Sequence, residues 1–269
     1  QCDVFSDRQL AKGIANMSDL VQAPLPGFPA PPPSLDTDKD SINDRANQLK
    51  DKDLPIHDWY RFVLSFPAHL VREYIDDFGL EKGSVVLDPF CGTGTTLVEA
   101  KLNGYRGVGL ETNPFPHFAS VVKTTWDIDP ILLLEQARQI AKATRDALRA
   151  QGIEDRRPFT GNLEKIQLRE LEPGAMKLLI KDSISPLPLH KVCVLLDHLR
   201  EHSHKAYYGH ALLALGYALV NKIGNLRFGP EVGVGQIKPD APVVSCWLSE
   251  VRKINSDLET VIGKEHPEC

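Results

Sequence analysis

The sequence predicts an α/β protein in which one strand–helix–strand unit is followed by a largely helical remainder. Two short, β-branched apolar segments flank a helical segment within roughly thirty residues, which is the pattern of a βαβ unit with parallel strands. After that unit, the apolar residues recur at helical spacing. Because two parallel strands alone make a poor sheet, we expect the sheet to be partial.

The length of 269 residues suits one large domain or two small ones. We predict an N-terminal arm and Pro-rich linker over 1–54, a βαβ region over 55–125 and a helical region over 126–269. The net charge of -5 means that any contact with nucleic acid must come from a local patch or from further sequence.

The five cysteines are scattered without a C-x-x-C pair, which favours a reducing cytoplasm over a disulfide framework or a zinc ribbon. No apolar run approaches the length of a membrane span. The chain begins on Gln1 and ends on Cys269, and we expect both ends to be cuts through a longer polypeptide.

A weak helix is predicted over 1–22. It is followed by "APLPGFPAPPPSLDTDKD", whose prolines predict an extended linker or arm. The next helix is predicted from Pro67, which suits a first turn, to Gly79, which suits a stop. Its apolar face consists of Leu70, Val71, Tyr74, Ile75 and Phe78.

The strand–helix–strand unit follows. "SVVLDPF" predicts a buried strand, a helix is expected from about Thr95 to Asn103, and "YRGVGLET" predicts the second strand. "NPFPHFASVVKT" begins another helix. Further helices are predicted over 130–151, 186–202, 205–222 and 241–262, and no third strong strand is visible.

The turn after the first predicted strand contains the residues that indicate a ligand-binding site. Asp88 ends the strand, and Gly92 and Gly94 allow the backbone to pass close to a ligand at the start of the next helix. Ligands of α/β sheets bind in this crevice, outside the carboxyl ends of the strands. The alternative is a glycine turn that only connects strand to helix, but that would not explain an acid at both strand ends.

The motif lacks the features of a loop that binds pyrophosphate, so pyrophosphate is not the expected ligand. The third glycine of G-x-G-x-x-G is replaced by Leu97, and no lysine follows Gly94 as in a P-loop. Asp88 suits a cationic or amino-bearing ligand. Glu111, 23 residues later at the end of the adjacent strand, can accept both hydroxyls of a ribose. S-adenosylmethionine combines an amino-acid end with a nucleoside end, so we predict it as the cofactor.

"LDPFCGTGTTLVEA" followed by "GVGLETNPF" resembles the cofactor motifs of the site-specific DNA amino-methyltransferases, which methylate adenine N6 or cytosine N4. The family loop reads D-P-F-x-G-[ST]-G-T-T, and this chain matches every fixed position, Pro89 included. The segments "SFPAHLVREYI", "HDWYRFVLSFP" and "NLRFGPEVGVG" also look like parts of these enzymes. The resemblance covers roughly residues 55–260, strongly at 85–115, and implies a Rossmann-like fold.

The resemblance assigns roles to the site residues. Asp88 would contact the amino end of S-adenosylmethionine, and Glu111 the ribose. Thr95 would cap the helix. The remaining assignments are Phe66 and Pro67 on the methionine side, Phe90, Gly92 and Gly94 on the pocket wall, and Asn113 and Pro114 near the adenine.

The catalytic motif of that family, [DNS]-P-P-[YFW], is not found in the chain. It would present an oxygen, a carbonyl and an aromatic face to a flipped base. "FPAPPPS", "SPLP" and "DAPVV" each lack part of it. In the family branch that this sequence most resembles, the motif would follow residue 269. We therefore predict no catalytic residue here, and a second chain or further segment that provides the motif.

The predicted function is therefore the cofactor-binding half of a DNA amino-methyltransferase of the restriction-modification type, acting on double-stranded DNA. The methyl group would pass directly to the exocyclic amine. Two alternatives stay open: an RNA methyltransferase, or a non-catalytic S-adenosylmethionine-binding or assembly subunit.

Three further features have a functional and a structural interpretation. His198, His202, His204 and His210 could hold a metal, but a solvated helix connection is favoured, and we predict no metal site. Arg227, with Glu231 and Lys222 near it, could contact DNA phosphate or the cofactor pocket, or "NLRFGPEV" could be a helix-terminal turn with a buried Phe228. The aromatic residues of "HDWYRF" could cover the adenine, receive a base or pack in the core. Cys91 is expected to have no chemical role.

Overall fold

The computed structural model describes residues 50–62, 65–155, 159, 166–228, 231–263, 266–267 and 269. These residues belong to one compact unit, residues 45–269. The predicted helix over 1–22 and the proline-rich linker lie outside the described residues. The boundaries at 54 and 125 stay predictions.

The described chain begins with two short 3-10 helices, η2 (Asp51–Asp53) and η3 (His57–Trp59). Helix α3 (Ala68–Asp77) begins one residue after the predicted start, because Pro67 has an extended backbone (ψ of 143°) and is the N-cap residue, not part of the first turn. Gly79 ends it with a φ of 59°, a conformation that glycine adopts without a steric penalty.

The βαβ unit is present. β1 (Val85–Asp88) runs parallel to β2 (Arg106–Gly109), with Val85 opposite Arg106 and Asp88 opposite Gly109, and α4 (Thr95–Leu102) connects them. α5 (Pro114–Thr124) follows β2. The structure is helix-rich with a small parallel sheet, which agrees with the α/β class, and the Rossmann-like assignment stays a prediction.

The two faces of this sheet differ. A Cβ atom added to Gly107 would lie 3.1 Å from Cδ2 of Leu97, and one added to Gly109 would lie 2.7 Å from Cδ1 of Leu97. Glycine at both positions therefore lets α4 pack directly on that face. Side chains alternate along a strand, so the opposite face presents Leu87 and its register partner Val108, which are both exposed.

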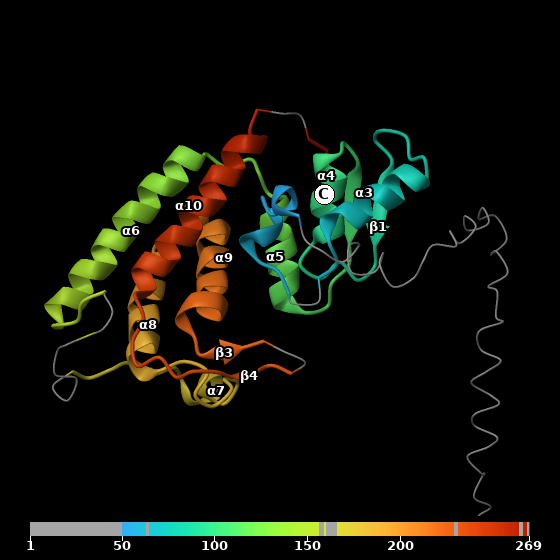
Figure 1. Ribbon diagram of the computed structural model, residues 1–269. Coiled ribbons are helices and arrows are strands. Elements are labelled where there is room, and N and C mark those ends of the chain that lie inside the picture. Colours follow the sequence, from blue (N-terminus) through green and yellow to red (C-terminus); the bar gives the residue numbers. More distant parts are fainter. Residues whose placement is uncertain are drawn as a thin grey trace, which may run out of the picture. The chain divides into compact units, whose positions relative to one another are not determined.

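The helical remainder consists of α6 (Pro130–Ala150), the short α7 (Pro173–Met176), α8 (Pro186–Arg200), α9 (Tyr208–Ala218) and α10 (Val243–Val261). Four of these helices lie where the sequence predicts them, and the short α7 was not predicted. α10 packs against both α6 and α9, and α8 packs against α6 (Figure 1). No helix among the described residues is both long and apolar enough to cross a membrane.

The segment predicted as one helix over 205–222 has a different structure at both ends. The α-helix begins at Tyr208, and it continues as a π-helix, η5 (Leu219–Ile223). Two very short strands follow, β3 (Leu226–Arg227) and β4 (Gly233–Val234), which pair antiparallel. Two-residue strands carry too little periodicity to be visible in a sequence.

Most buried apolar side chains form one main core, to which η3, α4, α5, α6, α8, α9 and α10 contribute. Its large, fully buried side chains include Trp59, Leu133, Leu195, Leu213 and Trp247. A second, smaller cluster lies under α3 and consists of Val71, Ile75, Ala100 and Tyr105. Neither β1 nor β2 contributes a residue to the main core.

Candidate functional site

The loop between β1 and α4 depends on two glycines with positive φ. Gly92 has a φ of 52°, and Gly94, the N-cap residue of α4, has a φ of 84°. A Cβ atom on Gly94 would lie 2.8 Å from Cβ of Ser120, whereas one on Gly92 would meet nothing within 4 Å. Gly94 is therefore required by both conformation and space, because the loop passes directly against α5.

Asp88 holds the first half of this loop. Its Oδ1 accepts a hydrogen bond from the backbone N–H of Phe90 at 3.0 Å, and its Oδ2 accepts one from Oγ1 of Thr96 at 2.6 Å. The carboxylate thus connects the end of β1 to the first turn of α4. Thr96 was not singled out from the sequence, although it is the second threonine of the matched T-T pair.

Glu111 holds the second half. Its Oε2 accepts from the backbone N–H of Gly92 at 3.0 Å, and its Oε1 accepts from the backbone N–H of Asn113 at 2.7 Å. The structure therefore brings Asp88 and Glu111 to the same loop, at the carboxyl ends of two adjacent parallel strands, as the sequence predicts.

These contacts determine which charge the loop can accept. In phosphate-binding loops, free backbone N–H groups point at the anion. Here the N–H groups of Phe90 and Gly92 already donate to carboxylates of the protein itself. A phosphate at this place would meet two negative side chains, so the loop favours a neutral or cationic ligand group.

The other predicted residues surround the two carboxylates. Asn113 caps α5, since its side chain accepts from the backbone N–H of Phe115 at 3.2 Å. Phe90 is 87% exposed, next to an exposed Pro89. The expected capping role of Thr95 is wrong: Gly94 is the N-cap residue, no side chain caps α4, and Thr95 is buried in the first turn.

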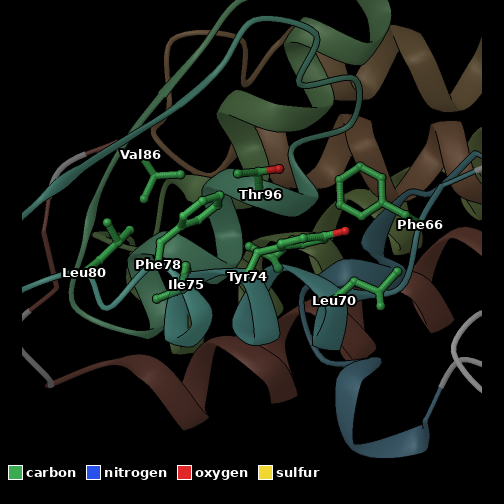
Figure 2. A pocket seen from close by; sticks show the side chains of 9 residues that line it. Phe66, Leu70, Tyr74, Ile75, Phe78, Leu80, Val86 and Thr96 are labelled. Carbon is green, nitrogen blue, oxygen red and sulfur yellow. The ribbon is translucent and has the colours of Figure 1, made fainter. Parts of the chain in front are cut away.

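An apolar cavity of about 380 Å³ lies between α3 and β1. Figure 2 shows the side chains of α3 pointing toward Val86 and Thr96. Phe66 lines this cavity together with Thr96, so Thr96 connects the cavity to Asp88. Pro67 precedes α3 as its N-cap residue. The cofactor contacts of all these side chains stay predictions.

Cys91 is part of the packing of the loop. Burial, followed by the charge of Asp88, raises the pKa of its thiol. A Cβ atom on Gly109 would lie 2.7 Å from Sγ of Cys91, so the side chain packs against β2. A buried, protonated thiol is a poor nucleophile.

A buried ionic network lies behind the loop, which the sequence did not indicate. On α4, Glu99 accepts from Nη1 of Arg72 at 2.8 Å and pairs with Nε2 of His57 at 2.8 Å. Nη2 of Arg72 donates to Oδ1 of Asp53 at 2.6 Å. The network joins α3 and the segment before it to the helix that follows the glycine loop. Burial lowers the pKa of His57 despite its bond to Glu99.

The aromatic segment "HDWYRF" divides into two parts. Trp59 and Tyr60 are buried in the main core, and Trp59 donates to Oδ2 of Asp257 at 2.8 Å, so core packing explains both. Phe62 is exposed and makes an edge-to-face contact with Tyr60. Residues 63–64, which follow it, lie outside the described residues.

The histidine segment has local partners. Nδ1 of His202 lies 2.7 Å from the hydroxyl of Tyr207, and Nε2 of His210 lies 2.9 Å from the carbonyl oxygen of Thr125. Burial lowers the pKa of His210 to about 4. No three His, Cys, Asp or Glu side chains of the described residues are grouped so that they could hold a metal ion.

In the "NLRFGPEV" segment, Arg227 and Glu231 are exposed, and Lys222 pairs with Glu250 of α10. The alternative of a buried Phe228 is wrong, because Phe228 is 38% exposed beside a short hairpin. A contact of Arg227 with DNA stays a prediction.

The structure thus places a glycine loop between two parallel strands and a carboxylate at the end of each strand, which is the region where α/β proteins bind ligands. Residues 37–118 match the family model described as DNA methylase, of the N6 and N4 methyltransferases. The chain is also 43% identical over 68 residues to the type II methyltransferase M.BsoBI of Geobacillus stearothermophilus. That match covers 25% of this chain and 13% of the relative, so the chain spans only a small part of that protein.

Both matches agree with the resemblance that the sequence motifs indicate: the segment around the glycine loop is similar to the DNA amino-methyltransferases. No solved structure is similar enough to the chain to count as a match.

Proposed function

We propose that this chain is the cofactor-binding part of an S-adenosylmethionine-dependent DNA methyltransferase. The target is the exocyclic amine of adenine (N6) or cytosine (N4) in double-stranded DNA, as in a cytoplasmic restriction-modification system. The matches to the DNA methylase model and to a type II methyltransferase support this proposal.

One observation carries the proposal: Asp88 and Glu111 flank a glycine loop in which the N–H groups of Phe90 and Gly92 already donate to these same carboxylates. The loop therefore favours a ligand with a cationic or amino group at one end and hydroxyls at the other. S-adenosylmethionine has an ammonium, a sulfonium and a ribose. Each carboxylate oxygen has a second lone pair with which it can accept from such a ligand.

The bare face of the sheet supports a second element of the proposal. Both faces of a parallel sheet are covered in α/β proteins, yet Leu87 and Val108 are exposed here, and β1 pairs only with β2 among the described strands. We propose that further strands, on another segment or a second chain, complete the sheet and bring the [DNS]-P-P-[YFW] motif to the cofactor loop. The Rossmann-like fold belongs to this completed form.

A second candidate is a non-catalytic S-adenosylmethionine-binding subunit. It is favoured by the sequence itself, in which no [DNS]-P-P-[YFW] motif is found. The two candidates share the cofactor site and differ in whether a catalytic partner gives methyl transfer to DNA.

Calorimetric titration of S-adenosylmethionine into the chain tests the shared part. Asp88→Ala and Glu111→Ala should each weaken binding by about 10- to 100-fold, the value of a charge-assisted hydrogen bond. Thr96→Val removes the bond that orients Asp88 but keeps both carboxylates, so it should weaken binding less than Asp88→Ala does. A folded chain that binds no cofactor, or that binds equally after both carboxylates are removed, would refute the proposal.

A further inference from the structure

A groove between α6 and α10 is lined by a concentration of positive charge. Its volume is about 360 Å³, and apart from Leu248 its lining consists of cationic side chains. These are Arg138, Lys142, Arg145 and Arg149 of α6 and Arg252 of α10. We call these five the basic groove.

The helical repeat explains why the cations of α6 form one row. Arg138, Lys142, Arg145 and Arg149 follow one another at intervals of four, three and four residues, which places them along one side of a helix. The side of α6 that packs into the main core has buried small or apolar residues such as Ala137, Ala141 and Leu148. The row therefore borders the contact of α6 with α10 and leaves the charged ends in solvent.

Asp146 offsets part of this charge. It accepts from Nζ of Lys142 at 2.7 Å and lies 3.0 Å from Nη1 of Arg149. Within the described ranges, no acidic side chain pairs with Arg138 or Arg252. These two guanidinium groups are exposed and available to an external anion.

Asp155 lies 3.6 Å from Nε of Arg145, but its carboxylate also accepts hydrogen bonds from the first turn of α10. Its Oδ1 accepts from the backbone N–H of Val244, and its Oδ2 from that of Ser245, both at 3.0 Å, at the start of α10. The five cationic side chains of the basic groove are thus balanced by only two nearby carboxylates among the described residues, those of Asp146 and Asp155. Such a patch stands out in a chain whose net charge is -5.

We propose that the basic groove binds the sugar-phosphate backbone of duplex DNA. This inference rests on the proposed function and names the surface on which its substrate lies. The row on α6 spans about 16 Å, because a helix rises about 1.5 Å per residue. One strand of DNA presents a phosphate about every 3.4 Å along the helix axis, so a row of this length can lie along about four or five phosphates.

The composition of the row also favours phosphate. Four of the five side chains are arginines, whose guanidinium groups bind phosphate oxygens through two parallel N–H bonds. Contacts of this kind position a protein on DNA without reading its sequence. The groove therefore would contribute affinity and register, and sequence recognition would come from elsewhere.

The test uses fluorescence anisotropy of a labelled duplex at a series of salt concentrations, with the chain and a double variant, Arg138→Gln/Arg252→Gln. The matched control is Lys177→Gln/Lys181→Gln, which removes the same charge from exposed positions elsewhere. Thermal melting shows that each variant is folded. The groove variant should bind about tenfold more weakly, and its log–log salt slope should fall by about 2, since each phosphate contact contributes about 0.9.

Three outcomes would overturn the inference. The groove variant could bind with the affinity and slope of the control, the unchanged chain could fail to bind duplex DNA, or polyglutamate could displace DNA at an equal concentration of charge. The last outcome would assign the groove to an acidic protein surface. Cofactor binding is measured separately, so none of these three results would refute the proposed cofactor site. A chain that binds DNA but no S-adenosylmethionine would refute the proposed function and leave the inference about the basic groove intact.

Discussion

The main core and the small cluster under α3 stabilise the molecule to different degrees. The main core joins helices from η3 to α10 around two fully buried tryptophans, Trp59 and Trp247. The cluster under α3 has four buried residues, and the neighbouring sheet leaves Leu87 61% exposed and Phe90 87% exposed. The packing of the helices therefore provides most of the stability of the chain. The sheet instead positions the candidate site, and part of its apolar surface is exposed.

The largest expected effect is in the main core. Trp247→Ala should lower the free energy of unfolding by about 3–5 kcal/mol, because it opens a cavity and removes the bond from Nε1 to the carbonyl oxygen of Ala211. Phe90→Ala, at an exposed aromatic in the loop, should change it by less than about 0.5 kcal/mol. Urea denaturation measures both. Equal losses would remove the contrast between the two regions.

The next effect is in the glycine loop. Gly94→Ala should cost about 2–4 kcal/mol, because it combines left-handed strain with overlap against Ser120. Gly92→Ala should cost only about 1 kcal/mol, since nothing lies near the added methyl group.

The rescue variant Gly94→Ala/Ser120→Gly separates the two causes. It removes the atom at 2.8 Å and should recover part of the loss in thermal melting. The loss caused by Ser120→Gly alone is subtracted, because that change removes the bond to His117 and places a glycine inside α5. No recovery after this subtraction would mean that strain alone decides at Gly94.

A pH effect is expected at Lys123 of α5, which is fully buried and donates to the carbonyl oxygen of Tyr60 at 3.3 Å. Burial, together with the charge of Arg61, lowers its pKa from 10.5 to about 7, against the opposing effect of Asp58. In the pH range between these two values the unfolded chain binds the extra proton, so the contribution of Lys123 to stability rises with pH. Below pH 7 its cost is present in full.

Lys123→Met should therefore stabilise the protein most at pH 6, and the difference from the unchanged chain should shrink toward pH 10. Denaturant midpoints across that range measure it. If the difference in stability between Lys123→Met and the unchanged chain did not vary with pH, the side chain of Lys123 would be exposed to water and not buried.

The smallest effect is expected on the bare face of the sheet. Leu87→Ser should change the stability of this chain by about 0.5 kcal/mol or less, since little burial is lost. The same substitution should weaken association with the proposed catalytic segment, measured by co-purification of the two parts. Val121→Ser, at an exposed position of α5, is the control. A large loss of stability in the chain alone would show that the face is already covered.

The sequence predicts the βαβ unit well because its signals are local. Val85–Asp88 is a short apolar run, and Gly94 marks the turn. Asn113 and Pro114 favour a helix start, because asparagine caps the first turn and proline suits the first helical position. The two carboxylates at the strand ends also follow from local order, once the strands are known to be parallel.

What the sequence could not show depends on distant partners. Glu99 is one more polar residue in a helical pattern, and only folding brings it to His57 and Arg72. The placement of Thr95 failed by one position, because the left-handed Gly94 is itself the cap residue and leaves Thr96 to reach Asp88. Spacing alone cannot distinguish which of two adjacent threonines points back to the strand.

The hydrogen bonds from Phe90 and Gly92 to the two carboxylates have a kinetic consequence. A loop whose backbone is already hydrogen-bonded does not have to fold around a ligand, so binding of the proposed cofactor would cost little chain entropy. Association should then be fast and the heat of binding nearly independent of loop ordering. In the proposed methyltransferase, the residence time of the cofactor would then be set by the contacts of the ligand itself, and not by a refolding step of the protein.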